Sequence, residues 1–379
     1  MISNKILYIF GSGRSNRIKV ENIKSTEFFY SYFYLKNKYP LTNLIEMKEE
    51  KPQQELSYKF LLIIDKILRK LTNLPFYFNL ITTKNNFVEI FKANKIIATN
   101  DRLGLSILPM VLISKIFKKS DLFIIVMGLF SKERPNFIVS FLQKIMINIL
   151  LTATSKLFFL GDGEYKDACR LYPKKKHKFV FTPFCVDTNF WKLQNDGVKE
   201  SSRNSVLFIG NDGNRDYDLV LEIANLLSEV NFIFITNYPF DSDDIPENVK
   251  LIQGSWNQNI LSDEEILNYY SISKLTVLPI KNTFQPSGQS VSLQSMSLGT
   301  PVMITDTKGF WDKTNFTHNE NIFFVKDNTK EVWASNIIEL LNNNVLLKKL
   351  SVNSINTVNT YYRQEIFDKT LEEYIGLNN

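Results

Sequence analysis

A helix N-terminus suited to binding phosphate is predicted within the stretch 278–309. Ser287 and Gly288 are residue types that begin helices, here one expected over 289–298. The first backbone N–H groups of a helix have no partner within it, and the helix dipole favours negative charge there. Four such donors would face a ligand, those of Gly288, Gln289, Ser290 and Val291.

Two side chains could extend this anion site. Gln294 lies one helical turn inward, where its amide could reach a ribose hydroxyl, and Lys281 adds a positive charge in the loop before the helix. The alternative is an ordinary turn between a strand and a capped helix. The residues alone leave both interpretations open.

The elements that must position these residues follow an alternating pattern. Short apolar segments alternate with longer amphipathic ones, which predicts an α/β fold with mostly parallel sheets. A chain of 379 residues exceeds what one hydrophobic core usually supports, so two domains are expected. The expected strands are 5–10, 95–99, 122–127, 156–160 and 178–182 in the first half, and 205–210, 231–236, 249–252, 275–279 and 301–305 in the second. Ser262 and Glu265 form a capping box that predicts a helix start, and the polar stretch 193–205 is the expected linker.

The two halves of the chain differ in charge. Residues 1–190 hold 30 Lys and Arg against 15 Asp and Glu, and the remainder holds 15 basic against 24 acidic residues. A basic N-terminal half favours an anionic partner, such as a phospholipid surface or a phosphate-bearing acceptor. Compositional drift in a chain rich in lysine and asparagine is the alternative. No nucleic-acid partner is expected.

The sequence indicates neither secretion nor a membrane span. Cys169 and Cys185 are too few for a disulfide framework, which favours a reduced, cytoplasmic setting. The apolar start of the chain is expected to be a strand, and the nearest candidate for a span, 103–117, is interrupted by a proline and a lysine. The segment 58–71 mixes apolar and basic residues, as an interfacial helix would, but a surface helix of a soluble core has the same pattern.

The stretch 278–309 resembles the signature of a large family, the retaining GT-B glycosyltransferases of the glycosyltransferase group 1 type. These include mannosyl- and glucosyltransferases of bacterial surface polysaccharides and glycolipids. Their signature has two glutamates, then Ala-Met, a small residue, a glycine and Pro-Val, and the segment 294–302, QSMSLGTPV, matches its latter part. Pro286 and Gln294 stand at the two glutamate positions. Three other segments resemble further parts of the family sequence, namely 181–191, 319–341 and 361–375.

The resemblance implies the GT-B architecture. In this architecture two Rossmann-like α/β/α domains face each other across a cleft, and a C-terminal helix crosses back to the N-terminal domain. The acceptor-binding domain would comprise 1–190 with the crossover helix in 361–379, and the nucleotide-sugar-binding domain 191–360.

The resemblance also assigns a diphosphate-binding role to Arg215. The segment 208–227 resembles the first strand, glycine loop and helix of the family's donor domain, with Gly210 in the loop. A basic residue of this loop normally holds the donor diphosphate, and Arg215 is the only one present. A guanidinium stays charged and can bind two phosphate oxygens at once. An ion pair of Arg215 with Asp216 or Asp218 is the alternative.

Gly11 and Gly13 belong to GSGRSN (11–16), directly after the first expected strand. The motif lacks the third glycine and the later acidic residue of a dinucleotide fingerprint, so NAD binding is not expected. In a GT-B enzyme the loop faces the cleft, where glycines let the backbone approach the donor phosphates or the acceptor, with Arg14 or Arg17 nearby. A turn that simply requires glycine is the alternative.

The residue that handles the acceptor proton is left open. His177 and His318 are not placed where family members often carry a histidine. In a retaining enzyme the leaving phosphate can accept the proton, whereas an inverting enzyme needs a carboxylate base. Asp101 is the best-placed carboxylate and Glu133 the next, although such residues more often cap helices or solvate loops. No metal or cofactor is expected, since Asp241, Asp243 and Asp244 are predicted to lie in a solvated loop.

These observations predict a metal-independent hexosyltransferase. It would move a sugar from a UDP- or GDP-sugar to a glycan or lipid-linked acceptor, in cell-surface glycan or glycolipid biosynthesis. It would work in the cytoplasm, with peripheral contact to the inner face of the membrane through its basic domain. A degenerate GT-B module that binds nucleotide or a partner, and a GT-B sugar-nucleotide epimerase, are the alternatives.

Overall fold

The computed structural model describes residues 5–19, 23–48, 56–118, 120–193, 203–254 and 260–377. The chain forms two compact units. The N-terminal unit comprises Met1–Thr182 with Asp368–Asn379, and the C-terminal unit comprises Pro183–Phe367. The boundaries predicted from the sequence were at 190 and 360. Most of the predicted linker, 194–202, lies outside the described residues.

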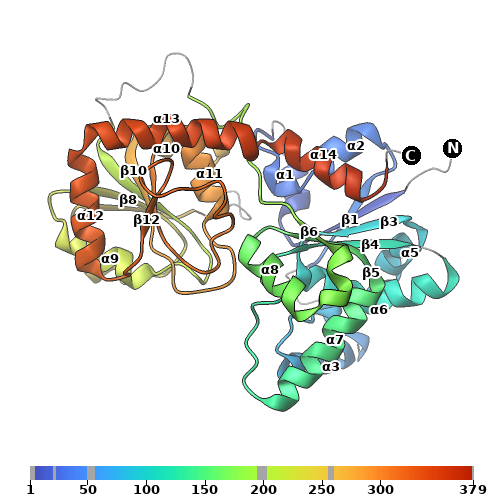
Figure 1. Ribbon diagram of the computed structural model, residues 1–379. Helices are drawn as coiled ribbons and strands as arrows, with labels where there is room; N and C mark the ends of the chain where they lie inside the picture. Colours follow the sequence, from blue (N-terminus) through green and yellow to red (C-terminus); the bar gives the residue numbers. More distant parts are fainter. Residues whose placement is uncertain are drawn as a thin grey trace. The chain divides into compact units, whose positions relative to one another are not determined.

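The N-terminal unit is built on a six-stranded parallel sheet of order β2-β1-β3-β4-β5-β6 (Figure 1). Its strands are β1 (Ile6–Phe10), β2 (Asn43–Glu46), β3 (Lys95–Ala98), β4 (Asp121–Val126), β5 (Thr154–Phe159) and β6 (Phe179–Phe181). All five residues of β1 are buried. Such continuous apolar strands are typical of parallel sheets that helices cover on both faces.

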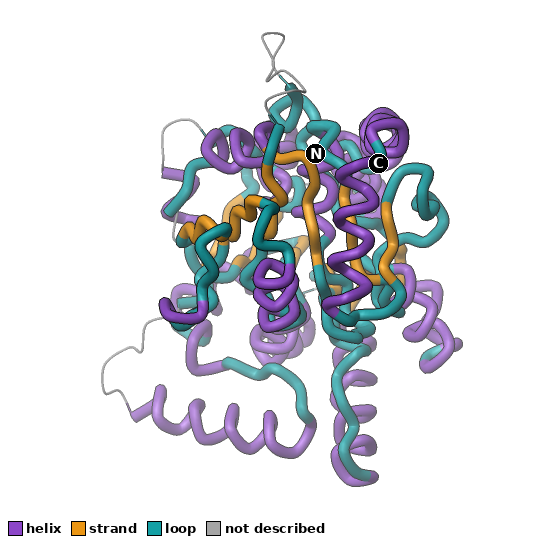
Figure 2. Tube along the Cα trace, turned by 90° about the vertical axis from the view of Figure 1, so that its left-hand side faces the viewer, coloured by secondary structure: helices purple, strands orange, loops and turns teal. Residues whose placement is uncertain are grey.

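Helices pack against this sheet, and Figure 2 draws the helices of the chain in purple and its strands in orange. They are α1 (Arg14–Lys19), α2 (Tyr32–Lys38), α3 (Leu56–Thr72), α4 (Phe78–Ile81), α5 (Lys84–Lys92), α6 (Asp101–Phe117), α7 (Phe137–Ala153) and α8 (Asp162–Leu171). None of the described helices is long and apolar enough to cross a membrane.

The last helix, α14 (Gln364–Tyr374), returns the chain to the N-terminal unit. The Glu372 carboxylate accepts hydrogen bonds of 2.6 Å from the hydroxyls of Tyr34 and Tyr39. It also lies 2.6 Å from the Lys38 ammonium. These contacts confirm the predicted return of the C-terminal helix.

Strand β2 was not predicted. It has four residues, of which only Ile45 is buried, so it lacks the apolar run that marks the other strands. It pairs with β1 at the edge of the sheet. Its position is therefore decided by pairing with β1 rather than by its own sequence.

The C-terminal unit has a second parallel sheet, of order β12-β11-β10-β7-β8-β9. Its strands are β7 (Ser205–Ile209), β8 (Asn231–Ile235), β9 (Val249–Ile252), β10 (Ser273–Leu278), β11 (Val302–Thr305) and β12 (Phe323–Val325). Its helices are α9 (Tyr217–Leu226), α10 (Asp263–Ile272), α11 (Gln289–Ser297), α12 (Lys330–Asn342) and α13 (Asn344–Tyr361). The two parallel sheets with their helices confirm the predicted α/β class.

Local sequence signals fix two helices of this unit. Ser262 and Glu265 form the predicted capping box of α10. The predicted helix over 289–298 is α11, and Gly299, with φ +70°, follows its end. This backbone conformation is one that glycine adopts at little cost.

The strand order of the C-terminal unit reverses between β7 and β10. Strands β7, β8 and β9 run to one side of the sheet, and β10, β11 and β12 run to the other. In such sheets ligands bind outside the carboxyl ends of the strands at the point where the order reverses. Here that point lies between β7 and β10, whose ends lead into the loops with Arg215 and Ser287.

Candidate functional site

The structure brings Arg215 to the start of α11. Its guanidinium donates a 2.6 Å hydrogen bond from Nη1 to the Ser287 hydroxyl, and the residue is only 2 % exposed. Backbone bonds join the two loops, since Lys281 N–H donates to Asn214 O at 2.8 Å. Residues 72 positions apart therefore converge on one charged, hydrogen-bonding site within the C-terminal unit.

Asp212 is the ionic partner of Arg215, and this pair was not predicted from the sequence. One oxygen of its carboxylate lies 3.0 Å from Nη1 of Arg215, and both oxygens accept from the Ser287 hydroxyl, at 2.9 and 3.1 Å. Asp216, one of the two partners weighed from the sequence, instead accepts from Leu219 N–H and caps α9. A carboxylate three residues before the arginine was the available signal, but only the fold of the loop brings the two together.

The Asp212 carboxylate contacts both Arg215 and Ser287. Its side chain is 42 % exposed, whereas that of Arg215 is 3 % exposed. The cation is thus held in place from inside the unit, and its anionic partner is open to water. This arrangement suits exchange of one anion for another.

Gly288 begins α11 with a backbone that requires glycine. Its φ is +82°, and an added Cβ would lie 3.2 Å from the terminal methyls of Ile280 and Ile304. Ser292 N–H donates to Gly288 O at 2.9 Å, which closes the first helical turn. Of the two residues predicted to cap this helix, Gly288 is the N-cap, and the Ser287 hydroxyl bonds to Arg215 and Asp212.

The other predicted donor-site residues surround this helix start. Gln289 and Val291 are buried, Ser290 is half-buried and the Lys281 side chain is exposed. Gln294 is 5 % exposed, and its Oε1 accepts from the Tyr270 hydroxyl at 3.2 Å. Tyr270 therefore fixes the orientation of the amide that was predicted to reach a ribose hydroxyl.

The Arg215 side chain packs against Gly210. A Cβ at this position would lie 2.4 Å from Nε of Arg215 and 2.8 Å from its Cγ, so the arginine side chain packs directly on the glycine. Nε of Arg215 also donates to Ile209 O at 3.4 Å. Glycine is needed here for the space that Arg215 occupies.

In the N-terminal unit, the loop with Gly11 and Gly13 is closed by a carboxylate. Gly13 has φ +91°, a conformation that favours glycine. Oε1 of Glu46, at the end of β2, accepts from the backbone N–H groups of Arg14 at 2.6 Å and Ser15 at 3.3 Å. These two N–H groups therefore bind the Glu46 carboxylate. This contact was not predicted, because strand β2, which places Glu46, was not predicted.

Asp101 and Glu164 hold the loop that follows β4. Asp101 is 4 % exposed and accepts from Met127 N–H at 3.0 Å. Glu164, 2 % exposed, accepts from the N–H groups of Gly128 at 2.9 Å and Phe130 at 2.8 Å. Asp101 was a predicted candidate, whereas Glu164 was not. Asp101 begins α6 after β3, and Glu164 lies in α8 after β5.

Burial changes the acidity of both carboxyl groups. It raises the pKa of Asp101, and it raises the pKa of Glu164 to about 8, with the nearby Asp101 charge adding to the effect. The backbone donors act in the opposite direction but do not cancel burial. The geometry of Asp101 is that of a residue that positions a loop.

Glu164 is expected to make stability fall as pH rises from about 4.5 to about 8. Below its unfolded pKa of 4.5 both states carry the proton, and above that value only the folded state keeps it, up to about pH 8. The free energy of unfolding therefore decreases with pH across this window. Urea unfolding at pH 5, 6, 7 and 8 should show a smaller pH slope for Glu164→Gln. Glu133→Gln, a change at an exposed carboxylate, is the control, and an equal slope in both variants would contradict the assignment.

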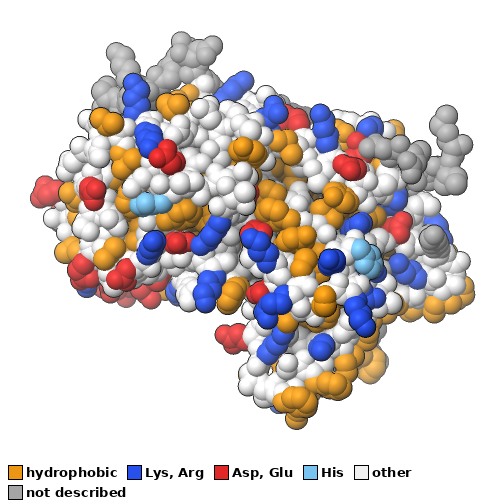
Figure 3. Space-filling view, in the orientation of Figure 1, with side chains coloured by type: hydrophobic (Ala, Val, Ile, Leu, Met, Phe, Trp, Pro, Cys, Tyr) orange, Lys and Arg blue, Asp and Glu red, His pale blue; other side chains and the backbone are white. Residues whose placement is uncertain are grey.

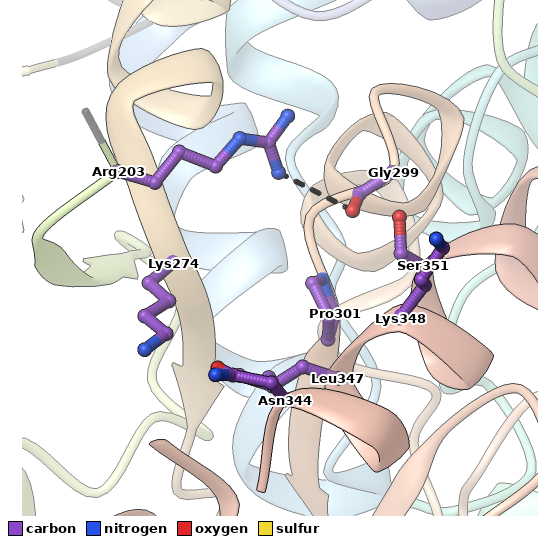
Figure 4. Close-up of a pocket in the computed structure, with 8 residues that line it drawn as sticks. All are labelled: Arg203, Lys274, Gly299, Pro301, Asn344, Leu347, Lys348 and Ser351. Carbon is purple, nitrogen blue, oxygen red and sulfur yellow. Dashed lines mark hydrogen bonds between the residues drawn. The ribbon is translucent and has the colours of Figure 1, made fainter. Parts of the chain in front are cut away.

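A cavity of about 490 Å³ lies elsewhere on the C-terminal unit (Figure 4). Lys274 and Pro301, which line it, stand at the amino ends of β10 and β11, whereas Arg215 and Ser287 follow the carboxyl ends of strands. Arg203 spans this cavity and donates to Gly299 O at 3.3 Å. The cavity is therefore separate from the predicted donor site. Within the described ranges, no three His, Cys, Asp or Glu side chains gather as a metal site.

Solved structures share this fold at low sequence identity. HepE from Anabaena, in complex with UDP-glucose, aligns with a TM-score of 0.67 and 11 % identity over 98 % of each chain. Sucrose-phosphate synthase from Thermosynechococcus elongatus gives 0.66 and 10 % over 98 % of each chain. A glycosyltransferase from Rickettsia africae gives 0.64 and 13 % over the whole of both chains. No curated protein sequence matches significantly.

A family match covers the segment that forms the candidate site. Residues 256–357 match the family described as glycosyl transferases group 1, and this range includes Ser287, Gly288 and all of α11. Arg215 lies outside the matched range. The chain thus has the GT-B fold, and residues 256–357 of its C-terminal unit resemble the glycosyl transferases group 1 family.

Proposed function

We propose that this protein transfers a hexosyl group from a nucleotide-sugar donor to a glycan or lipid-linked acceptor. The observation that supports this most is the buried Arg215 guanidinium, held 2.6 Å from Ser287 at the start of α11. A fixed cation beside a helix N-terminus suits a diphosphate. The family match and the position at the strand-order reversal support the same choice.

In this proposal the donor diphosphate binds to Arg215, the Ser287 hydroxyl and the backbone N–H groups at residues 288–291. The diphosphate takes the place of the Asp212 carboxylate, which is exposed enough for water to solvate it. Gly210 gives Arg215 its space, Lys281 adds charge, and Gln294 contacts the ribose. Gly11 and Gly13, in the N-terminal unit, allow the backbone of their own loop to approach the acceptor.

Transfer breaks the bond between the anomeric carbon and the diphosphate oxygen, and a bond to the acceptor hydroxyl oxygen forms. Negative charge grows on the leaving diphosphate, where Arg215 and the helix N-terminus stabilise it more than in the ground state. We propose a retaining reaction without metal, in which the leaving phosphate takes the acceptor proton. Asp101 then positions the loop at 127–130 rather than acting as the base.

The proposed setting is the cytoplasmic face of a membrane, in the synthesis of cell-surface glycan or glycolipid. The basic N-terminal half supports contact with anionic lipid. UDP is the first nucleotide to test, because the HepE structures hold UDP or UDP-glucose.

Nucleotide binding and turnover test the proposal in two stages. Thermal unfolding is measured with UDP, GDP or ADP at 100 times the dissociation constant, where binding to the folded state alone adds about 2.7 kcal/mol. One nucleotide is expected to raise the melting temperature, and the matching nucleotide sugar is then expected to be hydrolysed or transferred. A rise without turnover would favour the non-catalytic module, consistent with Pro286 and Gln294 at the glutamate positions. No rise with any nucleotide would contradict donor binding.

A further inference from the structure

Two neighbouring helices of the N-terminal unit, α3 and α7, expose rows of large apolar side chains. On α3, Phe60 is 64 % exposed, Ile63 57 % and Ile67 50 %. On α7, Phe137 is 84 % exposed, Ile138 65 % and Phe141 55 %. The two helices pack against each other, and orange side chains gather over them at the lower edge of Figure 3. These six side chains are called the apolar face below.

Folding does not account for this face. Another set of α3 residues, Leu61, Ile64 and Leu68, already packs against the hydrophobic core of the unit. Phe60, Ile63 and Ile67 are spaced by three and four residues and form a second apolar row that points away from it. Single exposed apolar residues are common on protein surfaces, but contiguous rows on packed helices mark an interaction site.

The charged side chains beside the apolar face are basic and favour an anionic partner. Lys59, Lys66 and Lys70 are exposed and follow a second row of α3, adjacent to Phe60, Ile63 and Ile67. The one acidic residue of α3, Asp65, is buried and accepts from the N–H groups of Phe78 and Asn79. Helix α7 contains no acidic residue. Within these two helices no exposed acidic residue accompanies the apolar rows, and the lysines beside them complement the surface of an anionic lipid bilayer.

The neighbouring helix α6 also exposes large apolar side chains. At the end of α6, Ile116 is 77 % exposed and Phe117 is 72 % exposed. Helix α6 packs against α7, and the Phe117 ring lies 6.3 Å from that of Phe91 on α5. Exposed apolar side chains therefore occur on three neighbouring helices, α3, α6 and α7. A bilayer can cover side chains on several helices without a matching protein shape.

We propose that the apolar face enters the interfacial layer of an anionic bilayer, with Lys59, Lys66 and Lys70 against lipid phosphates. The inference gives the membrane contact of the proposed function a defined surface. It rests on that function only for the lipid-linked acceptor, because the face belongs to the N-terminal unit and the donor residues Arg215 and Ser287 to the C-terminal unit. A second copy of the chain is a less suitable occupant, since the lysine rows of two copies would repel.

Sedimentation with vesicles tests this proposal on the whole protein. The wild type is expected to bind phosphatidylcholine vesicles containing phosphatidylglycerol more tightly than phosphatidylcholine alone. Ile63→Ser/Ile67→Ser/Phe141→Ser should weaken binding at least about tenfold, because the apolar area that enters the bilayer is removed. Lys59→Gln/Lys66→Gln/Lys70→Gln should remove most of the preference for phosphatidylglycerol.

The control is Val345→Ser/Val352→Ser, two exposed valines of α13 in the other unit, which should bind vesicles as the wild type does. All these sites are at least half exposed or basic surface positions, and circular dichroism with thermal unfolding checks that each variant folds. A nucleotide-induced rise in melting temperature that persists in the serine variant separates this surface from the donor site. Vesicle binding unchanged by the triple serine substitution would overturn the proposal. So would light scattering that shows a dimer abolished by that substitution, without vesicle binding by the wild type.

Discussion

Arg215→Ala is expected to lower turnover at least about tenfold. A charge-assisted hydrogen bond is worth roughly 1.5–3 kcal/mol, and each 1.4 kcal/mol changes a rate about tenfold. If Arg215 contacts the diphosphate most strongly as the sugar leaves, kcat and kcat/KM should fall together, whereas a loss of ground-state binding alone would raise KM. The measurement is steady-state transfer from the nucleotide sugar identified by thermal shift.

Two further variants make the Arg215 result interpretable. Arg170→Ala removes an exposed arginine that pairs with Asp167 at 3.1 Å, and it should leave turnover unchanged. Ser287→Ala removes the hydroxyl that bonds to both Arg215 and Asp212. This variant tests the same site if Arg215→Ala unfolds the protein. A folded Arg215→Ala variant with wild-type kinetics would remove this arginine from the proposed mechanism.

Gly210→Ala is expected to impair transfer about as much as Arg215→Ala does. The added Cβ would lie 2.4 Å from Nε of Arg215 and must push the guanidinium away from Ser287. Alanine leaves the charge in the protein but misplaces it, so the prediction tests position separately from charge. A displacement of about 1 Å at a reacting group can cost a large part of the rate.

Gly213→Ala is the matched control for Gly210→Ala. Gly213 lies in the same loop, and an added Cβ would meet nothing within 4 Å. We expect wild-type turnover for Gly213→Ala, and for Gly210→Ala a fall in turnover similar to that of Arg215→Ala. Equal kinetics in the two variants would show that the packing of Arg215 on Gly210 is irrelevant to catalysis.

Much of the fold follows from local sequence. Ten strands were predicted close to their observed positions, because parallel strands that helices cover on both faces consist of short apolar runs in the sequence. The capping box at Ser262 and the glycine at 299 determine helix ends through nearby residues alone. Strand β2 was missed because only Ile45 of its four residues is buried.

The candidate site was predictable only in part. The helix start at Gly288 could be located because the signals for a helix lie within a few residues of each other. The carboxylates Asp212, Glu46 and Glu164 could not be assigned, because each acts on groups that only the loop fold or a neighbouring element brings within reach. No pattern of composition or spacing encodes such contacts.

The sequence by itself determined that the chain has alternating strands and helices, a basic N-terminal half and a helix that starts near Gly288. The tertiary structure decided that Arg215 lies against Ser287, that Asp212 pairs with Arg215, and that α3 and α7 expose an apolar face. The physical reason is range. Backbone preference and capping act over a few residues, whereas ion pairs and exposed faces depend on which distant segments the sheet order brings together.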